Sequence, residues 1–505
     1  MRLRVCVVVI LSSFLSSGCV PKHIRPQSEV LRAEDFGLKK TNGKFSRTIW
    51  PTLDWWKVFG DKQLNLLVQE GIANSSDLRA AEARIRQANA IAGSVESELW
   101  PSLNGTAEFS RSRTSLYGRG NGAWSKLYDA KISSYFELDI WGKNRAALKA
   151  AIGRLKSKEI ERYATQLSLA HSIVQAYINL DQLYSELAIQ QEMLETYKSL
   201  LELTRQRYFA DLDSLVSVKQ ALAAIPATRA EIASLRESLE LTRNQFVMLV
   251  GKGPDRGLQI EEPSINYADI TMVPDNLPAE LLGHRPDIVA NRWMVEAKSY
   301  DVRVSKAEYY PNINLSSFIG VQSLGFSNLH KRNSYEFSVG PALSLPIFDA
   351  GRLDSNLADA ISSYDLAVEN YNAGLTGALQ DLADQMTSLK WLKERLKERL
   401  KERPKEQGEA LKTSQESADL ALAQYGAGLV SYLQVISTQS VVFSQKLLLS
   451  QLTSRGLSLY AQLNRALGGG YSPDNLPLVS DISSNLLEPR NERRLQELSA
   501  TRSLN

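Results

Sequence analysis

The chain of 505 residues contains two copies of one pattern, set about 210 positions apart. Asp77 opens an Ala-rich amphipathic segment that ends near Pro101, and Asp287 opens a similar one that ends near Pro311. Two further pairs of segments match in the same order: Phe136–Lys143 with Leu345–Arg352, and Arg207–Ser214 with Gln424–Ser431. Because this period is far longer than those of solenoid repeats, we interpret the chain as a duplicated half-molecule. The first repeat is expected over residues 51–265, the second over 266–473, and a polar tail over 474–505.

Each repeat contains two segments in which apolar and polar residues alternate. They predict β-strands over residues 102–113 and 124–139 in the first repeat, and over 312–323 and 334–348 in the second. Aromatic residues mark their ends: Trp100, Trp124, Trp141, Tyr309, Tyr310 and Phe348. Long strands with one apolar face and aromatic ends are typical of membrane β-barrels. The alternative is a soluble antiparallel sheet whose apolar face packs on a core.

Four strands are too few to close a membrane barrel. The smallest single-chain barrels have about eight strands, and an open sheet edge is not tolerated in lipid. If these strands lie in a membrane, several chains must therefore share one barrel. Three chains would supply 12 strands, roughly the size of known barrels.

The strands alternate with very long helices, expected over residues 143–208, 214–249, 351–425 and 430–467. No proline occurs between Gly142 and Tyr208, and apolar residues there recur at three- and four-residue steps, as in a coiled coil. A helix of this length would reach roughly 100 Å at 1.5 Å per residue. That length suits a tube across the periplasm better than an ordinary helical bundle, which has shorter helices.

The second half carries an insertion, which we place at residues 392–408. Residues 392–403 read as three LKER units, and Gly351 and Tyr425 lie eight positions further apart than Gly142 and Tyr208. Pro404 opposes a smooth helix. We therefore expect a break or outward bulge between about 390 and 410, with the two helical tips level. The segment is interpreted either as a solvated face without a partner or as a docking knob for peptidoglycan or an accessory protein.

The N-terminus reads as a targeting segment. Residues 1–18 combine Arg2 and Arg4 with a short apolar stretch, as in a signal peptide. The residues before Cys19 resemble a bacterial lipobox, although Ser16 occupies the usual Leu position. We expect lipidation of Cys19 and a lipid-anchored extension over residues 19–50. The alternative is an ordinary signal peptide with an incidental cysteine.

Composition argues against catalysis and against nucleic-acid binding. The 59 basic and 56 acidic residues leave a net charge of +3, and the chain has only two Cys and four His. No phosphate-binding loop, nucleophile elbow or HExxH motif is present. We expect a protein that is not an enzyme, with no cofactor and no metal site.

Together these landmarks resemble the TolC-like outer-membrane factor family, in particular the lipid-anchored components of efflux systems with resistance-nodulation-division pumps. The segments that carry the resemblance are Phe136–Gly142, His284–Ile288, Ala307–Pro311, Leu343–Arg352 and Tyr425–Tyr432. The resemblance implies an α+β membrane protein of duplicated halves, with four transmembrane β-strands and long coiled-coil helices per chain. It implies a homotrimer that forms a 12-strand β-barrel on an α-helical barrel, projecting from the Gram-negative outer membrane into the periplasm. Under this resemblance, Asp77 and Asp287 are interpreted as helix N-caps and not as catalytic acids.

The resemblance also implies a function and partners. The chain would be a passive exit duct in contact with outer-membrane lipid, receiving small molecules from a periplasmic adaptor and an inner-membrane pump. Two alternatives remain open: a protein-secretion duct of the same fold, and a structural coiled-coil lipoprotein without a pore.

In the family, the helical tips meet the adaptor and close the pore. The matching tip positions here are Leu212, Ser214, Gly428, Leu429 and Ser431. The residues expected to line the aperture are Asp211, Asp213, Gln434 and Ser437. Many relatives carry acidic residues where Gln434 and Ser437 stand, so the sequence predicts an aperture that attracts cations weakly.

Overall fold

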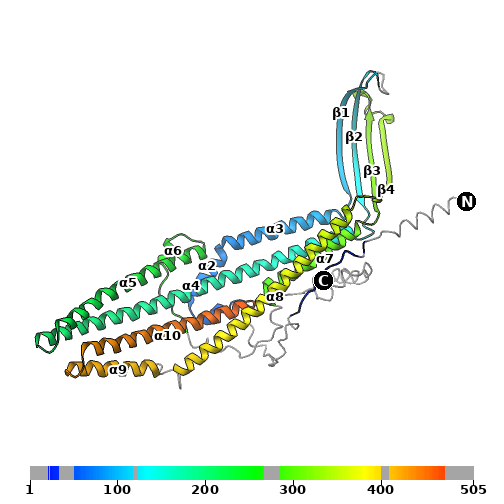
Figure 1. Ribbon diagram of the computed structural model, residues 1–505. Coiled ribbons are helices and arrows are strands. Elements are labelled where there is room, and N and C mark those ends of the chain that lie inside the picture. The colour runs from blue at the N-terminus through cyan, green and yellow to red at the C-terminus, as the bar shows by residue number, and fades with distance from the viewer. Residues whose placement is uncertain are drawn as a thin grey trace.

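The computed structural model describes residues 21, 23–32, 51–117, 122–266, 284–399 and 409–472. These residues form a long rod of α-helices that carries a four-stranded β-sheet at one end (Figure 1). The main helices are α3 (Ser76–Ser97), α4 (Lys143–Phe209), α5 (Leu215–Val250), α7 (Pro286–Ala307), α8 (Arg352–Arg399), α9 (Glu409–Gly426) and α10 (Tyr432–Ala466). Shorter elements are η4 (Trp55–Phe59), α2 (Lys62–Asn74), α6 (Asp255–Leu258), η6 (Phe326–Asn328) and η7 (Arg332–Ser334).

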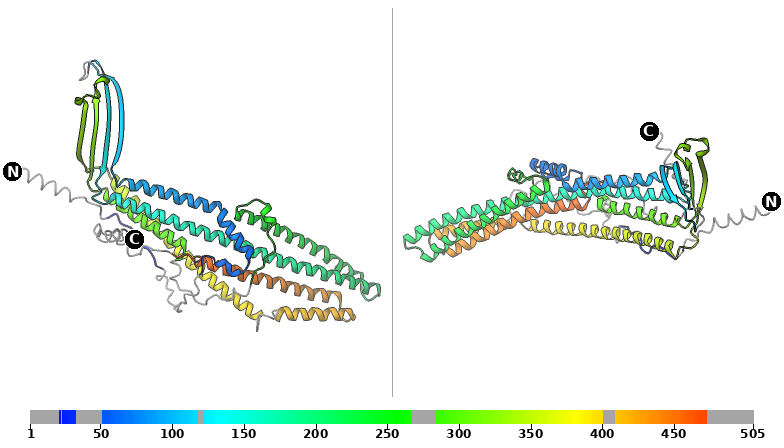
Figure 2. Two further views of the ribbon diagram at one scale, coloured as in Figure 1. Left: turned by 180° about the vertical axis from the view of Figure 1, so that it is seen from behind. Right: turned by 90° about the horizontal axis from the view of Figure 1, so that it is seen from above.

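The helices form a wall whose membership changes along the rod. Near the sheet, α3 and α7 pack against α4, and α8 packs against α7. Toward the other end, α5 and α10 pack against α4, and α9 packs against α10. The order α3–α4–α7–α8 thus gives way to α5–α4–α10–α9, and α4 runs through both halves (Figures 1 and 2). The two hairpins of the far half, α4–α5 and α9–α10, end side by side.

A belt of short elements wraps the middle of α4. Trp55, Phe59 and Leu64, from η4 and α2, are buried in one cluster with residues of α4 that include Tyr177. Asp61 caps α2 by accepting a hydrogen bond from the Gln63 amide (2.7 Å), and its carboxylate also accepts one from the Tyr177 hydroxyl (2.6 Å). This cap therefore fixes the start of α2 to the rod.

A left-handed turn of three glycines closes the same belt after α10. Gly468, Gly469 and Gly470 have φ values of +85°, +59° and +83°. A Cβ on Gly469 would lie 2.2 Å from Leu167 Cδ1, and one on Gly470 would lie 2.3 Å from the Thr52 carbonyl carbon. Only glycine combines this backbone with such close approach.

The sheet contains β1 (Ser102–Arg113), β2 (Trp124–Glu137), β3 (Asn312–Ser323) and β4 (Tyr335–Ser344), antiparallel in the order β1–β2–β3–β4. The first two strands come from the first repeat and the last two from the second. Strands of both repeats therefore pair through β2 and β3, and β1 and β4 form the two edges.

The register places the apolar positions of all four strands on one face. Gly105 pairs with Ile132, Ile132 with Ile319, and Ile319 with Phe337. Paired residues share a face of the sheet, and the next row, from Thr106 through Lys131, is polar. Ile132, Ile319 and Phe337 are 56%, 61% and 82% exposed. The apolar face is thus open in the described chain, which contradicts the alternative of a soluble sheet packed on a core.

Each long helix that follows the sheet begins at a glycine with positive φ. Gly142 (φ +77°) precedes α4 and Gly351 (φ +85°) precedes α8. An aspartate caps each start: Asp139 accepts from the Asn144 and Arg145 amides, and Asp349 accepts from the Gly351 and Leu353 amides. The two repeats thus turn from sheet to rod with the same chemistry.

Two residues that the repeat suggests as helix caps lie inside the helix instead. The cap of α3 is Ser75, whose hydroxyl accepts from the Leu78 amide at 3.3 Å, and Asp77 lies in the first turn. Before α7, Arg285 is the capping position and Asp287 lies in the first turn behind Pro286. The interpretation of Asp77 and Asp287 as caps was wrong. A carboxylate in the first turn also favours the helix through its dipole, so both positions give a similar sequence signal.

The insertion expected at residues 392–408 falls mostly outside the described residues. The second half is described as two helices, α8 ending at Arg399 and α9 beginning at Glu409, with residues 400–408 between them outside the description.

Candidate functional site

The two helical tips have the same backbone turn. In the first, the Leu212 amide donates to the Arg207 carbonyl at 2.9 Å, and in the second the Leu429 amide donates to the Gln424 carbonyl at 2.8 Å. Asp211 (φ +56°) and Gly428 (φ +80°) occupy the matching left-handed position. These are Schellman ends of α4 and α9. The repeat is therefore preserved at the tips even where Asp replaces Gly.

A serine follows each turn and begins the next helix. Ser214 is the cap of α5, and its hydroxyl accepts from the Ser217 amide at 3.2 Å. Ser431 occupies the capping position of α10, without a side-chain cap bond. At each tip, only a few residues therefore lie between the Schellman end of one helix and the serine that begins the next.

Tyr425 joins the two tips to each other. It is almost fully buried at the end of α9. Its hydroxyl donates a hydrogen bond to the Asp213 carboxylate of the first tip and lies 3.1 Å from the Thr204 hydroxyl of α4. The ends of the two hairpins therefore lie at the same height along the rod, to within the length of one tyrosine side chain.

Arg207 adds a second link across the same junction. Its guanidinium donates to the Gly426 carbonyl of the second tip (3.2 Å) and to the Leu212 carbonyl of its own (3.1 Å). It also lies 4.6 Å from the centre of the Tyr425 ring and 3.8 Å from the Asp213 carboxylate. We call Arg207, Asp213 and Tyr425 the tip bridge.

The bridge sets the protonation of its own members. Burial would raise the pKa of the Asp213 carboxyl, but hydrogen bonds from Tyr425, Ser217 and the Ser214 amide, with the Arg207 charge, hold it below its usual value. Burial and then the adjacent Asp213 raise the pKa of the Tyr425 hydroxyl. At neutral pH the bridge therefore holds an ionised carboxylate and a protonated tyrosine.

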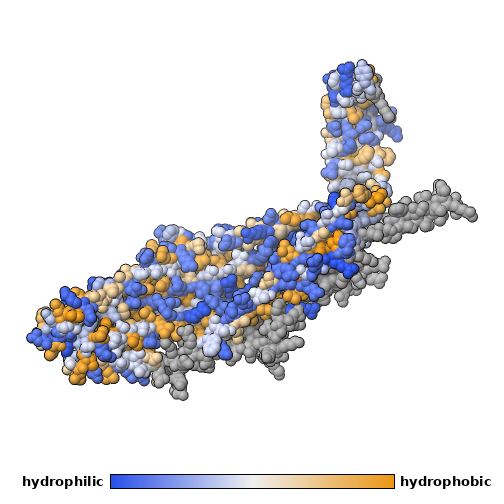
Figure 3. Space-filling view, in the orientation of Figure 1, coloured by the Kyte–Doolittle hydropathy of each residue, from blue (hydrophilic) through white to orange (hydrophobic). Residues whose placement is uncertain are grey.

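Around the bridge the tips expose apolar side chains. Leu212 is 63% exposed and Leu429 is 75% exposed, at matching positions of the two turns. The other large exposed apolar residues here are Tyr208, Phe209, Leu215, Val216 and Leu433. In the space-filling view, apolar groups gather at this end of the rod (Figure 3). Such patches are typical of protein contact surfaces.

Gln434 and Ser437, expected at the aperture, lie in the first two turns of α10. Gln434 lines a shallow hollow of about 310 Å³ between α9 and α10, with Glu416, Gln424 and Thr438 among its neighbours. Ser437 donates to the Gln434 carbonyl at 2.9 Å. Neither brings charge to the tip. Asp211 is exposed beside the first turn, whereas Asp213 is mostly enclosed by the bridge.

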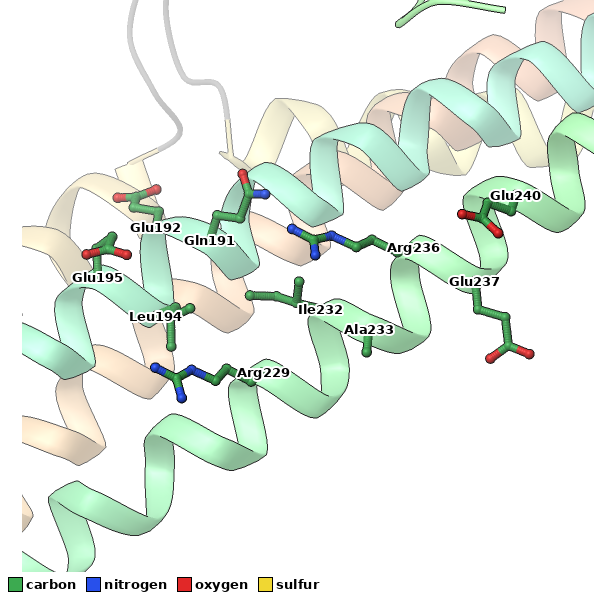
Figure 4. A pocket seen from close by; sticks show the side chains of 10 residues that line it. All are labelled: Gln191, Glu192, Leu194, Glu195, Arg229, Ile232, Ala233, Arg236, Glu237 and Glu240. Carbon is green, nitrogen blue, oxygen red and sulfur yellow. The ribbon is translucent and has the colours of Figure 1, made fainter. Parts of the chain in front are cut away.

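A larger hollow of about 1010 Å³ separates α4 from α5 in the middle of the first hairpin. Arg229 and Arg236 extend from α5 toward α4, which contributes Glu192 and Glu195 (Figure 4). It is an open surface groove with charges of both signs. Among the described residues, no group of His, Cys, Asp and Glu is arranged to hold a metal ion.

The bridge could not be read from the sequence as a site. Arg207 and Tyr425 mark the repeat, but they are 218 positions apart and occupy non-equivalent places in it. A buried tyrosine and arginine at helix ends are common, so only their contact in the fold reveals the link.

No helix in the described ranges is both long and apolar enough to span a bilayer.

Known proteins share this arrangement. The family model of outer membrane efflux proteins matches residues 67–252 and 277–469. The chain belongs to the outer membrane efflux protein family. The fusaric acid resistance protein FusA of Burkholderia cepacia is 32% identical over 365 residues, covering 70% of this chain and 68% of FusA. The multidrug resistance outer membrane protein MdtP of Escherichia coli K12 is 28% identical over 489 residues, covering 93% and 97%.

Solved structures agree with this membership. The outer membrane protein VceC of Vibrio cholerae matches this efflux protein with a TM-score of 0.78 and 34% identity, covering 84% of this chain and all of VceC. The outer-membrane channel OprN matches with a TM-score of 0.79 and 27% identity, covering 90% and 100%. The expected family, membrane fold and outer-membrane efflux function are thereby confirmed. The protein is an outer-membrane efflux duct.

Cys19 lies outside the described residues, but the chain just after it is described. Residues 23–32 run along α8 in extended form. Asp365 accepts from the Gln27 and Ser28 amides (3.2 Å each), and Asn372 accepts from the Leu31 amide (3.0 Å) and donates to the Glu29 carbonyl (2.9 Å). We call residues 23–32 the strap. It fastens the start of the chain to the second repeat.

Proposed function

We propose that three copies of this efflux protein form one passive duct. The observation that carries the proposal is the four-stranded sheet. Among the described residues, its edges β1 and β4 pair with no further strand and its apolar face is open. In lipid, such edges must pair with another chain. Three copies supply 12 strands in which β4 of one copy pairs with β1 of the next, within the size range of membrane barrels.

The helical wall supports the same closure. Its described edges are α3 and α5 on one side and α8 and α9 on the other. Exposed apolar residues on these edges include Ile91, Leu241, Leu366 and Leu420. If α8 and α9 of one copy packed against α3 and α5 of the next, these apolar residues would be buried and the helices would close into a tube.

The tips are proposed to meet a periplasmic adaptor and to close the duct. The exposed pair Leu212 and Leu429, with Ser214, Gly428 and Ser431, offers the contact surface. Asp211, Asp213, Gln434 and Ser437 would then line the aperture. The tip bridge links the two hairpins. The duct can therefore open only when Tyr425 of the second tip releases the first tip and Arg207 of the first tip releases the second. An inner-membrane pump would supply the energy for transport.

The cargo is proposed to be small molecules. The relatives are named for fusaric acid and multidrug resistance, which favours this cargo over secreted proteins.

Lipidation at Cys19 would attach the strap to the membrane. Replacement of Cys19 by Ser tests it: mass spectrometry should lose the acyl groups, whereas an unmodified wild-type residue 19 would contradict the proposal.

The duct is tested with the purified full chain. Native mass spectrometry should give three copies per particle, and planar bilayers should show channels. In cells, deletion of the gene should raise susceptibility to the exported compounds, with rescue by wild-type protein only when pump and adaptor are present. A monomeric particle that retains its four-stranded sheet would refute the proposed architecture.

A further inference from the structure

The apolar face of the sheet becomes basic at the end farthest from the rod. The apolar positions of β1 end at Phe109, and the next two residues on that face are Arg111 and Arg113. The same face of β2 carries Lys126 and Trp124 at this end, opposite the two arginines. In the space-filling view, hydrophilic residues gather at this end of the sheet (Figure 3). The face that would contact lipid therefore carries positive charge beyond its apolar band.

Two of these cations lie directly opposite each other. Arg111 pairs with Lys126 across β1 and β2, and both residues are exposed. Opposed residues of an antiparallel pair have Cβ atoms about 5 Å apart, and like charges at such positions destabilise the pairing. An anion in contact with both side chains would turn this repulsion into attraction. We call Arg111 and Lys126 the cation pair.

The two chain segments at this end of the sheet contain no carboxylate. Residues 110–127 and 324–334 include no Asp or Glu, but they include four Lys or Arg in the first segment and two in the second. The acidic residues that come next, Glu108 and Asp129, lie in a row that faces the other side of the sheet. Asp129 is paired there with Lys131 at 3.5 Å. The charge that neutralises the cation pair is therefore expected from outside these segments.

Aromatic residues lie on both sides of the cation pair. On the side of the rod, Phe109 and Tyr128 have ring centres 4.7 Å apart, and Phe326 lies 5.6 Å from Tyr128. On the far side, the Arg111 guanidinium lies 4.7 Å from the centre of the Trp124 ring. Membrane barrels carry aromatic girdles at both interfaces, and a charge on the lipid-facing surface costs little only near an interface. The cation pair therefore lies at the depth of the lipid headgroups.

We propose that the cation pair binds a phosphate group of lipopolysaccharide, the phosphorylated glycolipid of the outer leaflet of the outer membrane. Because the helical rod projects into the periplasm, the opposite end of the sheet faces this leaflet. Arg binds phosphate through two parallel N–H groups, and Lys supplies a point charge. Lys331 and Arg332, exposed between β3 and β4, add positive charge at the same end.

The bound lipid would hold the outer rim of the duct at a fixed depth. Its acyl chains would lie against the apolar face of the sheet, and its phosphate would lie against the cation pair. One site per copy would give three around the barrel. The inference rests on the proposed closure of three copies into one barrel in the membrane.

The test uses lipid A, the phosphorylated membrane anchor of lipopolysaccharide. Full-length trimers in detergent are titrated with diphosphoryl lipid A in mixed micelles, and bound lipid is counted by native mass spectrometry. The test variant is Arg111→Gln with Lys126→Gln. The control is Lys156→Gln with Lys198→Gln, which removes the same charge from paired lysines of α4 in the rod. We expect the apparent affinity to fall by roughly fivefold for each cation removed from the pair and to be unchanged in the control.

A third variant, Arg111→Glu, separates lipid binding from the stability of the strands. It places a carboxylate opposite Lys126, so the strand pair should gain a favourable cross-strand contact while the phosphate site is lost. Thermal unfolding without lipid should show a stability equal to or above that of the wild-type protein, and lipid A binding should fall at least as far as in the test variant. Wild-type binding of lipid A by Arg111→Glu would refute the site.

Equal binding by the test and control variants would also overturn the proposal. So would equal affinity of the wild-type protein for dephosphorylated lipid A, or displacement of lipid A by millimolar inorganic phosphate, which would indicate a site for free anions. Trimer mass and channel conductance are recorded for each variant. If these stay intact while lipid binding is unchanged, the lipid site fails and the exit duct stands. If wild-type protein forms no trimer, the proposed function itself fails.

Discussion

The Tyr425 hydroxyl donates a hydrogen bond to the Asp213 carboxylate and thereby joins the two helical tips. The two residues come from different repeats and are 212 positions apart. The backbone turns around them are equivalent, yet the link itself is asymmetric, because the first tip supplies the carboxylate and the arginine while the second supplies the tyrosine. The two tips therefore share their backbone turn, whereas the contact between them is not repeated.

Tyr425→Phe should weaken closure of the duct. It removes one hydrogen bond to the ionised Asp213 carboxylate, a loss of about 1.5–3 kcal/mol per copy. We expect larger or more frequent openings in planar bilayers and greater uptake of bulky antibiotics by cells. Tyr432→Phe is the matched control, because Tyr432 packs in the same cluster without bridging to Asp213. Equal openings in both variants would mean that the bridge does not hold the tips.

Closure should not depend on pH near neutrality. The folded-state pKa of Asp213 is lowered, so its contribution is present above the unfolded pKa, near 3.9, and is lost only as pH falls through the still lower folded value. The raised pKa of Tyr425 keeps the donor protonated beyond pH 10. Channel conductance should stay flat from about pH 5 to pH 9. Opening with a midpoint near pH 6 would show that another group controls the tips.

Cations should block the closed duct weakly. Gln434 and Ser437 are uncharged, and Asp213 is occupied by the bridge, so Asp211 is the remaining exposed carboxylate among the expected aperture residues. The measurement is bilayer current with added hexammine cobalt. Gln434→Asp with Ser437→Asp should create strong block, since three copies would place six carboxylates at the aperture. Strong block of the wild-type protein that survives Asp211→Asn would contradict this expectation.

Gly469→Ala should destabilise the protein by about 1–3 kcal/mol through left-handed strain and overpacking. The added Cβ would meet Leu167 at 2.2 Å, and φ is +59°. Gly377→Ala in α8 is the control: nothing lies within 4 Å of its Cβ, and alanine favours a helix interior by about 1 kcal/mol. Thermal unfolding in detergent should show opposite shifts for the two variants. A tolerated Gly469→Ala would mean that the three-glycine turn is not required.

The periodic elements could be predicted from sequence, because their signals are local. Alternation placed the strands, and Gly142 and Gly351 marked the starts of the long helices. Helix starts were misread where a carboxylate in the first turn, such as Asp77, gives the same signal as a cap. The tip bridge and the three-glycine turn were not predictable. Each depends on contacts between segments far apart in the chain, such as Gly469 with Leu167, and their residue types have many other uses.

Deletion of residues 393–400 should leave the duct functional. In each repeat, a residue with positive φ marks each end of the long helical span. These residues are Gly142 and Asp211 in the first repeat and Gly351 and Gly428 in the second. The second span is eight residues longer than the first. At 1.5 Å per residue, an unbroken helix would overshoot the first tip by about 12 Å. The Tyr425–Asp213 bond excludes that overshoot, so the wall must absorb the excess between the two ends.

The deletion is designed to keep the described packing. Leu392 is buried beside Gly456 of α10, and removing residues 393–400 joins it to Lys401, so that it becomes the first residue of one intact LKER unit. Trimer mass, bridge-dependent closure and drug resistance should match the wild-type protein. The control deletes residues 357–364 from α8, which removes the same length but includes the buried Leu357 and Tyr364 and should abolish assembly. Loss of assembly with the 393–400 deletion would show that the added residues belong to the wall.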